Sequence, residues 1–161
     1  MDNKKLLYEG IFFEGETVEM LHGCEKMFIQ SDILDSLIAK PILHCTFKYR
    51  PNREEIFDEI VGQEIAIEVI GYGFDGKNSG VLVRLPDDMK KYYLNYDQEG
   101  TLKKAHITIS LGVGAKAVDT AFLDFKPLPT PFIIRGRFGY CIREGKREHI
   151  SYEPFIEEKI I

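Results

Sequence analysis

The sequence predicts an α+β protein built from two similar lobes of antiparallel sheet around a central cleft. Three observations lead to this prediction. Several short segments alternate polar and apolar residues, which is typical of strands with one buried face. Short helical segments lie between them. A strand with His-x-Thr, a connector and a glycine-containing strand follow one another twice along the chain. The whole chain, residues 1–161, is long enough for one domain with a shared core.

The first half of the chain is expected to contain two strands and two short helical segments. Strands are expected at 6–13 and 42–49. A short helix or turn is expected at 31–38, with Ser31 as N-cap, and one or two helical turns are expected at 53–60, with Asn52 as cap. In the strand at 42–49, alternation places Cys45 on the core side. We therefore interpret this cysteine as a packing residue and not as a nucleophile.

The second half is expected to begin with a hairpin and to end in strands. The hairpin pairs 64–72 with 81–85 around a turn at 75–80, and strands follow at 105–111, 132–142 and 149–155. Residues 87–96 have helical periodicity, and residues 115–125 form either a helix or a loop. Prolines at 127, 129 and 131 exclude a helix there.

Two His-x-Thr motifs, His44 to Thr46 and His106 to Thr108, are the candidate catalytic residues. Residues i and i+2 of a strand point to the same side, so each strand presents an imidazole and a hydroxyl together. In a cleft between two such strands, one neutral histidine can take a proton from water while the other, protonated, gives one to a leaving oxygen. The hydroxyls can bind the non-bridging oxygens of a phosphodiester. No metal or cofactor is expected.

Other residues are candidates for binding the substrate. Lys48 follows Thr46 by two positions and is expected on the same face, while Tyr49 and Tyr72 can stack on a base. The glycines of Gly112-Val113-Gly114, beside Lys116, either cradle a phosphate through backbone N–H groups or form a plain turn. A third motif of the same form, His149-Ile150-Ser151, lies in a charged and poorer strand and is an alternative to one of the others.

Composition favours a small anionic substrate. The net charge is -5 and the pI about 5.4, so the chain lacks the positive surplus that binds long duplex nucleic acid. Three widely spaced cysteines predict neither a zinc site nor a disulfide framework. No apolar run is long enough to span a membrane, and the start has no signal peptide. A cytoplasmic protein without a membrane partner is expected.

Paired His-x-Thr-x motifs on two strands resemble the 2H phosphoesterase superfamily. The branch most similar to this chain contains the cyclic phosphodiesterase domains of fungal and plant tRNA ligases and the phage anti-CBASS nucleases. Residues 44–49, 62–73 and 106–118 carry the resemblance, within about half of the chain. The resemblance implies a bilobal fold, no metal, and hydrolysis or ligation of phosphodiester bonds. It also implies that His44 and His106 are the catalytic pair and that Thr46 and Thr108 bind phosphate.

The sequence leaves three functions open. The first is hydrolysis of a nucleotide phosphodiester: a 2′,3′-cyclic RNA end, a cyclic nucleotide or a cyclic oligonucleotide signal of antiviral defence. The second is a nucleotide sensor or sponge with little turnover. The third is repair or ligation of RNA ends, against which the acidic pI counts. Base, ring size, the roles of the two histidines and the oligomeric state stay open.

Overall fold

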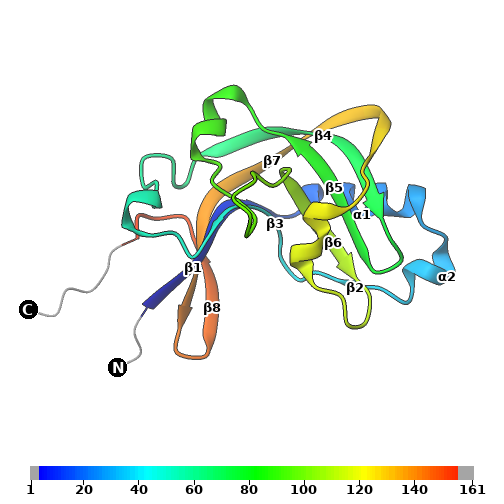
Figure 1. Ribbon diagram of the computed structural model, residues 1–161, viewed down its shortest axis with the longest axis horizontal. Helices are drawn as coiled ribbons and strands as arrows, with labels where there is room; N and C mark the ends of the chain where they lie inside the picture. The colour runs from blue at the N-terminus through cyan, green and yellow to red at the C-terminus, as the bar shows by residue number, and fades with distance from the viewer. Residues whose placement is uncertain (1–3, 156–161) are drawn as a thin grey trace, which may run out of the picture.

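The computed structural model describes residues 4–155, which form an α+β structure dominated by one antiparallel sheet (Figure 1). Its strands are β1 (Lys4–Phe13), β2 (Ile38–Ala39), β3 (Leu43–Tyr49), β4 (Glu64–Phe74), β5 (Asn78–Arg84), β6 (His106–Leu111), β7 (Lys126–Glu144) and β8 (Arg147–Ser151). The helices are α1 (Glu16–Phe28) and α2 (Ser31–Leu34), with 3-10 turns η1 (Arg53–Glu55), η2 (Asp87–Tyr92) and η3 (Ala117–Phe122).

The order of the strands in the sheet is symmetric about its centre. Six strands lie in the order β6-β5-β4-β7-β1-β3, with β2 beside β6 and β8 beside β7. One half of three strands, β4-β5-β6, therefore corresponds to the other half, β7-β1-β3. The glycine-containing strand that follows each His-x-Thr strand in the chain belongs to the opposite half. This crossing joins the halves through the pairing of β4 with β7.

The two halves also share their register. Gly10 lies opposite Thr46 in one half, and Gly80 lies opposite Thr108 in the other. In both halves the register shifts immediately before the glycine, at Glu9/Gly10 and at Ser79/Gly80. The internal repeat therefore includes a glycine and a β-bulge beside each His-x-Thr motif.

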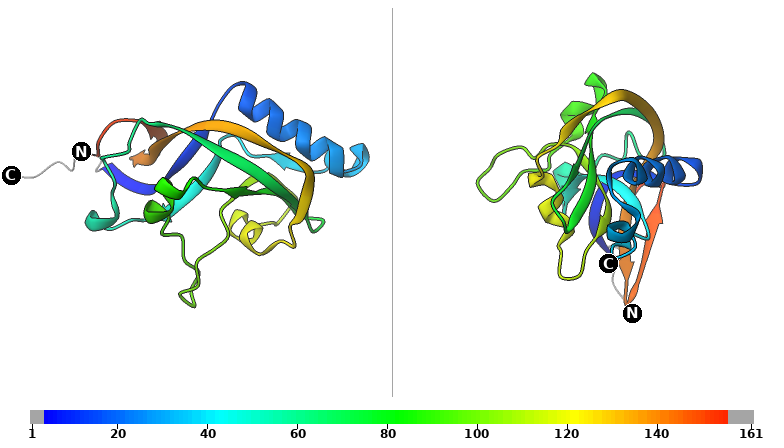
Figure 2. Two further views of the ribbon diagram at one scale, coloured as in Figure 1. Left: turned by 90° about the horizontal axis from the view of Figure 1, so that it is seen from above. Right: turned by 90° about the vertical axis from the view of Figure 1, so that its right-hand side faces the viewer.

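The sheet curls so far that its two ends meet, as the views in Figure 2 show. Backbone hydrogen bonds hold the two end strands at corresponding residues, each three positions after a motif histidine. The Ile109 carbonyl accepts from Lys40 N–H and the Phe47 carbonyl accepts from Leu94 N–H, both at 2.9 Å. Strands β3 and β6 thus become neighbours although they lie far apart in the order of the sheet. The two motif-bearing strands are brought together in this way.

The inner side of the curled sheet forms the hydrophobic core. Alternate residues of the two end strands, Cys45 and Phe47 in β3 and Ile107 and Ile109 in β6, are fully buried there. The prediction that Cys45 packs in the core is confirmed. Opposite alternation leaves the motif histidines and threonines on the outer side of both strands, half-buried.

Helix α1 was not expected from the sequence, and a buried carboxylate joins it to the sheet. Glu25 is 3% exposed and accepts hydrogen bonds from Ser79 Oγ at 2.5 Å and from Ser110 Oγ at 3.1 Å. The helix begins after Gly15 without a side-chain cap, and Met20 and Met27 are exposed on it. Its start signal and its apolar periodicity are therefore both weak.

Several expected elements differ in extent. Ser31 is the first residue of α2 and makes no capping bond, so its N-cap role is wrong. Asn52 does cap a helical turn, with a reciprocal bond from Asn52 N–H to Glu55, but that turn is only η1. Strand β7 continues through the three prolines because the pairing with β4 jumps from Phe132 to Pro127 at that point.

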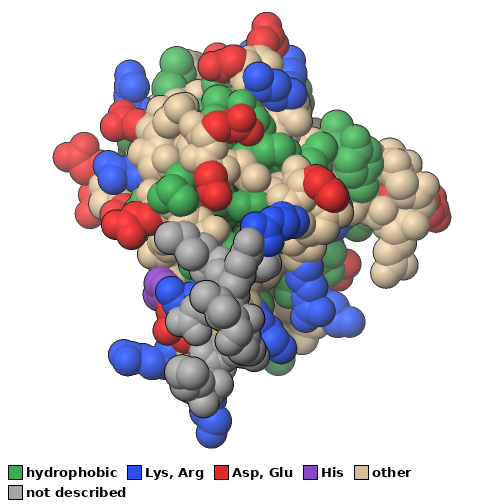
Figure 3. All heavy atoms as spheres, turned by 90° about the vertical axis from the view of Figure 1, so that its left-hand side faces the viewer, with side chains coloured by type: hydrophobic (Ala, Val, Ile, Leu, Met, Phe, Trp, Pro, Cys, Tyr) green, Lys and Arg blue, Asp and Glu red, His purple; other side chains and the backbone are tan. Residues whose placement is uncertain are grey.

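Charge is unevenly distributed over the surface. Figure 3 faces the end of the molecule where β1 begins, and Lys and Arg side chains gather on the lower part of this face. Among residues 4–155, no helix combines the length and apolar character needed to cross a membrane.

One carboxyl group lies buried on the core side of β1. Glu9 is 0% exposed, and neither of its oxygens makes a hydrogen bond of ordinary geometry with the described residues. Burial raises the pKa of Glu9 to about 8; Glu55 and Asp58 add to the effect, whereas the backbone of Phe57 and Lys48 oppose it. Glu9 is therefore protonated in the folded protein at neutral pH.

We expect Glu9 to make the stability of the protein depend on pH. Between about pH 4.5 and 8 the unfolded chain releases this proton while the folded protein keeps it, so stability falls as pH rises through this window. Glu9→Gln removes that dependence. Urea denaturation should show the variant gaining on the wild type by on the order of 3 kcal/mol from pH 5 to pH 8. An equal difference at both pH values contradicts the raised pKa.

Candidate active site

The two motif histidines meet on the outer face of the joined end strands. His44 lies in β3 opposite Phe12 of β1, and His106 lies in β6 opposite Leu82 of β5, at corresponding positions of the two halves. The charge of His106 acts on the pKa of His44, and the Cys45 thiol contacts the backbone of His106. The structure thus brings the two imidazoles into one site.

His106 is held in a defined orientation. Its Nδ1 lies 2.7 Å from the backbone carbonyl of Lys104, two residues earlier, which fits an N–H that donates to that oxygen. The other nitrogen, Nε2, is then left for chemistry. Burial lowers the pKa of His106, while the Lys104 carbonyl opposes this by favouring the protonated ring.

His44 occupies the corresponding position but is less firmly held. Its ring stacks on Tyr8 with centroids 4.7 Å apart and is tilted against Phe12 at 5.7 Å. Its Nδ1 is buried without a hydrogen bond among the described residues. Burial, followed by the charge of Lys40, lowers the pKa of His44 to about 4, and the Ile42 carbonyl, also two residues earlier, raises it.

A lysine stands near each histidine. Lys40, which follows β2, lowers the pKa of His44, and Lys103, which precedes β6, lowers the pKa of His106. Both effects are secondary to burial, yet both show positive potential at the imidazoles. An anion placed between the rings is favoured by both lysines.

A buried chain of hydrogen bonds supports Thr108. Its Oγ1 lies 2.8 Å from Thr120 Oγ1 in η3, and Asn78 Nδ2 donates to the same Thr120 oxygen at 3.0 Å. Asn78 Nδ2 also donates to the Lys116 carbonyl at 2.7 Å. Gly80 leaves the room for η3, because a Cβ there lies 2.5 Å from Thr120 Cγ2. The position of Thr108 is thus set from behind by β5 and η3.

Thr46 has a more open environment. It faces Gly10, and its hydroxyl makes no hydrogen bond with the residues that the structure describes. Its backbone carbonyl accepts from Asn95 Nδ2 at 3.4 Å, a long contact. The hydroxyl of Thr46 is therefore available to a ligand.

The β-bulge in β3 exchanges the expected faces of Lys48 and Tyr49. Lys48 lies opposite the buried Glu9, and its Nζ pairs with Glu55 at 3.4 Å, so it does not share the face of His44. Tyr49 lies opposite Tyr8 instead and stacks with it at 6.2 Å. The expected position of Lys48 is therefore wrong, because an extra residue in one strand reverses the alternation beyond it.

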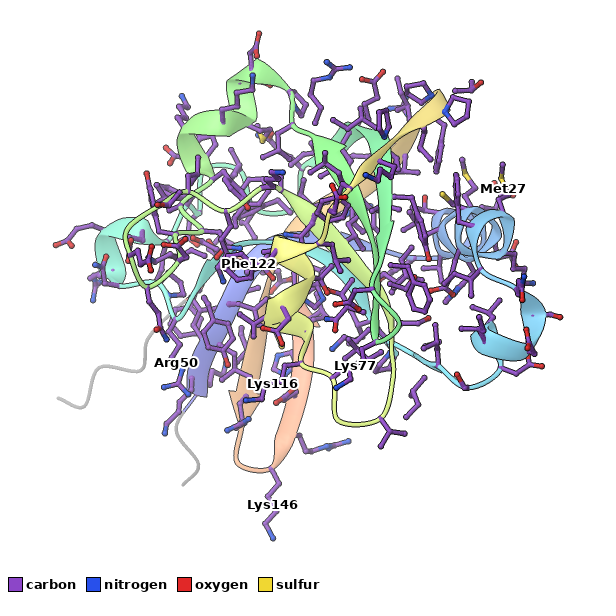
Figure 4. All side chains as sticks on the ribbon, turned by 45° about the vertical axis from the view of Figure 1, so that its right-hand side comes forward. Met27, Arg50, Lys77, Lys116, Phe122 and Lys146 are labelled. Atoms are coloured by element: carbon purple, nitrogen blue, oxygen red, sulfur yellow. The ribbon has the colours of Figure 1, made fainter. Side chains whose placement is uncertain are left out.

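The remaining candidates lie at the edge of the site or away from it. Tyr72 is buried, with its hydroxyl 2.7 Å from Ser79 Oγ and its ring stacked on Phe28. The Gly112 N–H donates to the Lys77 carbonyl at 2.6 Å, and Gly114 has a φ of 79°, which is typical of a turn. Figure 4 shows Lys116 projecting from this part of the molecule.

The third motif and the fourth histidine lie elsewhere in the fold. His149 is exposed in β8, where it pairs with Ile142 of β7. Strand β8 is neither of the two end strands, β3 and β6, that carry the other motifs. His22 lies in α1, 3.7 Å from Glu25. Neither residue belongs to the site formed by the two end strands.

Comparison with models of known protein families finds no match for this chain, and comparison with curated proteins finds none either. Within residues 4–155, no three side chains of His, Cys, Asp or Glu are grouped as metal ligands would be. The metal-independent reaction stays a prediction.

Sequence reasoning missed residues that contact the motifs from other elements. Tyr8, Lys40, Lys103 and Thr120 all belong to this group. A glycine followed by two apolar residues, Gly10-Ile11-Phe12 and Gly80-Val81-Leu82, marks the partner of each motif strand. That short repeat is the signal that could have located the partners.

We expect the Thr120 hydroxyl to stabilise the site. Thr120→Val keeps the volume of the side chain but leaves the Asn78 amide and the Thr108 hydroxyl without their shared partner, so unfolding should require about 1–2 kcal/mol less free energy. Thr120→Ser keeps the hydroxyl and should lose less. Urea denaturation of both variants, with exposed Thr101→Val as control, checks this. A larger loss for Ser than for Val would assign the effect to packing of the methyl group.

Proposed function

We propose that the protein is a 2H-type phosphoesterase that hydrolyses a nucleotide phosphodiester without a metal. The observation that carries the proposal is the placement of His44 and His106 at corresponding positions of two halves whose end strands meet. The sheet with its symmetric strand order supports the bilobal arrangement that the resemblance implies. The substrate is a small nucleotide or an RNA end, and the protein acts in the cytoplasm.

The proton inventory follows from the two histidines. His44, whose pKa is lowered to about 4, is neutral and takes the proton of the attacking water. His106, whose Nδ1 is held by the Lys104 carbonyl, gives a proton from Nε2 to the leaving oxygen. Water forms the new P–O bond, the ester P–O bond breaks, and one proton moves from water to His44 while another moves from His106 to the alcohol.

The other side chains of the site act on the phosphate. The Thr46 hydroxyl donates to a non-bridging oxygen, where charge accumulates in the transition state. The Thr108 hydroxyl donates to Thr120 Oγ1 in the free protein and turns its proton to the phosphate when the substrate binds. Lys40 and Lys103 add positive potential on the two sides. An anion in this position raises the pKa of both imidazoles, which supplies the protonated form that His106 needs.

A nucleotide sensor with little turnover is the second candidate. Burial lowers the pKa of both histidines, so both rings are neutral near pH 7 in the free protein. A site without a protonated histidine binds but does not cleave. A nucleotide that raises the melting temperature and is recovered unchanged would favour this function.

The proposal is tested with a panel of cyclic phosphodiesters in the presence of EDTA, with products identified by mass. The panel contains 2′,3′-cyclic mononucleotides, 3′,5′-cyclic mononucleotides, and cyclic di- and trinucleotides. We expect one class to be cleaved, and we expect His44→Ala and His106→Ala each to lower kcat by at least about a hundredfold.

Matched controls separate catalysis from folding. His149→Ala and His22→Ala remove histidines outside the site and should retain full activity. Circular dichroism should show that all four variants are folded. Full turnover in both His44→Ala and His106→Ala would exclude the two-histidine mechanism, and loss of turnover with EDTA would exclude a metal-independent one.

The rate should be greatest at mildly acidic pH. Catalysis needs one neutral and one protonated ring, and both rings have a pKa below the usual 6.5. Therefore kcat/KM should already be falling with rising pH at neutrality, because the acid has lost its proton, and it should fall again as pH is lowered toward 4, where His44 is protonated. The two limbs belong to the pair and not to single residues. A plateau that extends to pH 9 contradicts this proton inventory.

A further inference from the structure

A basic hollow is lined by residues from the start of β1, from the segment after β3 and from the end of β7. It has a volume of about 400 Å³, and five of its lining residues are basic: Lys4, Lys5, Arg50, Arg53 and Arg143. None of the described residues that line it is acidic. In a chain with a net charge of -5, this grouping of positive charge marks a place for an anion.

Two of these cations are not engaged with carboxylates. Lys4 pairs with Glu144 at 3.6 Å, and Arg143 pairs with Glu148 at 3.0 Å. Lys5 and Arg50 have no carboxylate partner within the described residues. These two side chains are therefore the ones that a bound anion can neutralise at the smallest cost.

A row of aromatic rings connects His44 with the hollow. Tyr8 stacks on His44 at 4.7 Å, Tyr49 stacks on Tyr8 at 6.2 Å with an interplanar angle of 13°, and the Arg50 guanidinium lies 5.7 Å from the centre of the Tyr49 ring. Arg50 is also a lining residue of the hollow. A series of ring contacts thus leads from a motif histidine to the group of cations.

The backbone at Arg50 is strained. Its φ is 51°, and it is the one residue other than glycine within residues 4–155 that has a positive φ. Its N–H donates to the Leu7 carbonyl at 2.8 Å, which fixes this conformation against β1. Strain of about 1 kcal/mol is retained where the guanidinium is held between Tyr49 and the hollow, as at many binding sites.

We propose that the hollow is a second phosphate site, so that the protein acts on oligonucleotides and not on single nucleotides. The scissile phosphate lies at the two histidines, the base of the adjoining nucleotide stacks on exposed Tyr49, and the next phosphate binds between Lys5 and Arg50. This inference rests on the proposed function. The shared chemistry is a second phosphodiester at one nucleotide's distance, in a linear RNA end or a cyclic oligonucleotide.

The test compares substrates that differ only in length. A 2′,3′-cyclic mononucleotide, a trinucleotide with the same 2′,3′-cyclic end and a cyclic trinucleotide are given to the wild-type protein, and kcat/KM is measured for each. Cleavage of the linear or of the cyclic trinucleotide distinguishes the two sources of the second phosphate. We expect the preferred trinucleotide to exceed the mononucleotide at least tenfold.

Lys5→Gln/Arg50→Gln removes the two unpaired cations. The ratio of the trinucleotide to the mononucleotide kcat/KM should then fall toward one, and the salt dependence of trinucleotide binding should weaken by about one in log–log slope. Lys90→Gln/Lys126→Gln is the matched control, because it removes two exposed cations that do not line the hollow. It should keep the wild-type ratio.

A binding experiment separates the failure of this inference from that of the proposed function. It measures the affinity of the His106→Ala protein for the labelled trinucleotide and mononucleotide by fluorescence polarisation. Trinucleotide affinity that drops at least fivefold on adding Lys5→Gln/Arg50→Gln supports the second phosphate site, even if no substrate is turned over. Equal affinity in both backgrounds, or equal kcat/KM for mononucleotide and trinucleotide in the wild type, overturns the second site and leaves the proposed function standing.

Discussion

The meeting of β3 with β6 is the constraint on which the rest of the structure depends. Strand β3 is the outermost strand of one half of the sheet, and β6 is the outermost strand of the other half. The sheet must therefore curl before their motifs can share a site. Close packing beside each motif requires a glycine: a Cβ at Gly10 lies 2.2 Å from the Cys45 carbonyl oxygen, and one at Gly80 lies 2.8 Å from the Ile107 carbonyl oxygen. Larger residues there push the partner strand away and widen the gap between the histidines.

Internal symmetry places the histidines, but it does not make them equivalent. In both halves a carbonyl two residues before the histidine faces the ring, yet only the Lys104 carbonyl makes a bond of ordinary length. His44 is instead enclosed by Tyr8 and Phe12, which desolvate it. The proposed mechanism needs an acid and a base that differ in proton affinity, and this difference in surroundings would provide it without any difference in the motif itself.

The sequence predicted what depends on alternation within a single strand. The strands β3 and β6, the inward side of Cys45 and the shared face of each His-x-Thr pair all follow from the period of two. Alternation fails at the β-bulge, because the bulge is set by pairing with β1. It reverses the faces of the sheet on which Lys48 and Tyr49 lie. Tyr8, Lys40 and Thr120 reach the site from other strands and turns, so only the pairing of the whole sheet could reveal them.

Positive potential and buried imidazoles have a joint consequence for binding. Lysines near both rings and burial together keep the free site unprotonated, because each added proton is repelled and poorly solvated. A phosphodiester anion reverses both effects, and linkage makes the coupling reciprocal: an anion that raises the pKa of an imidazole is itself bound more tightly when that imidazole is protonated. If the protein acts as proposed, substrate binding and proton uptake are one event. In that mechanism the site becomes competent for acid–base chemistry only when a phosphate occupies it.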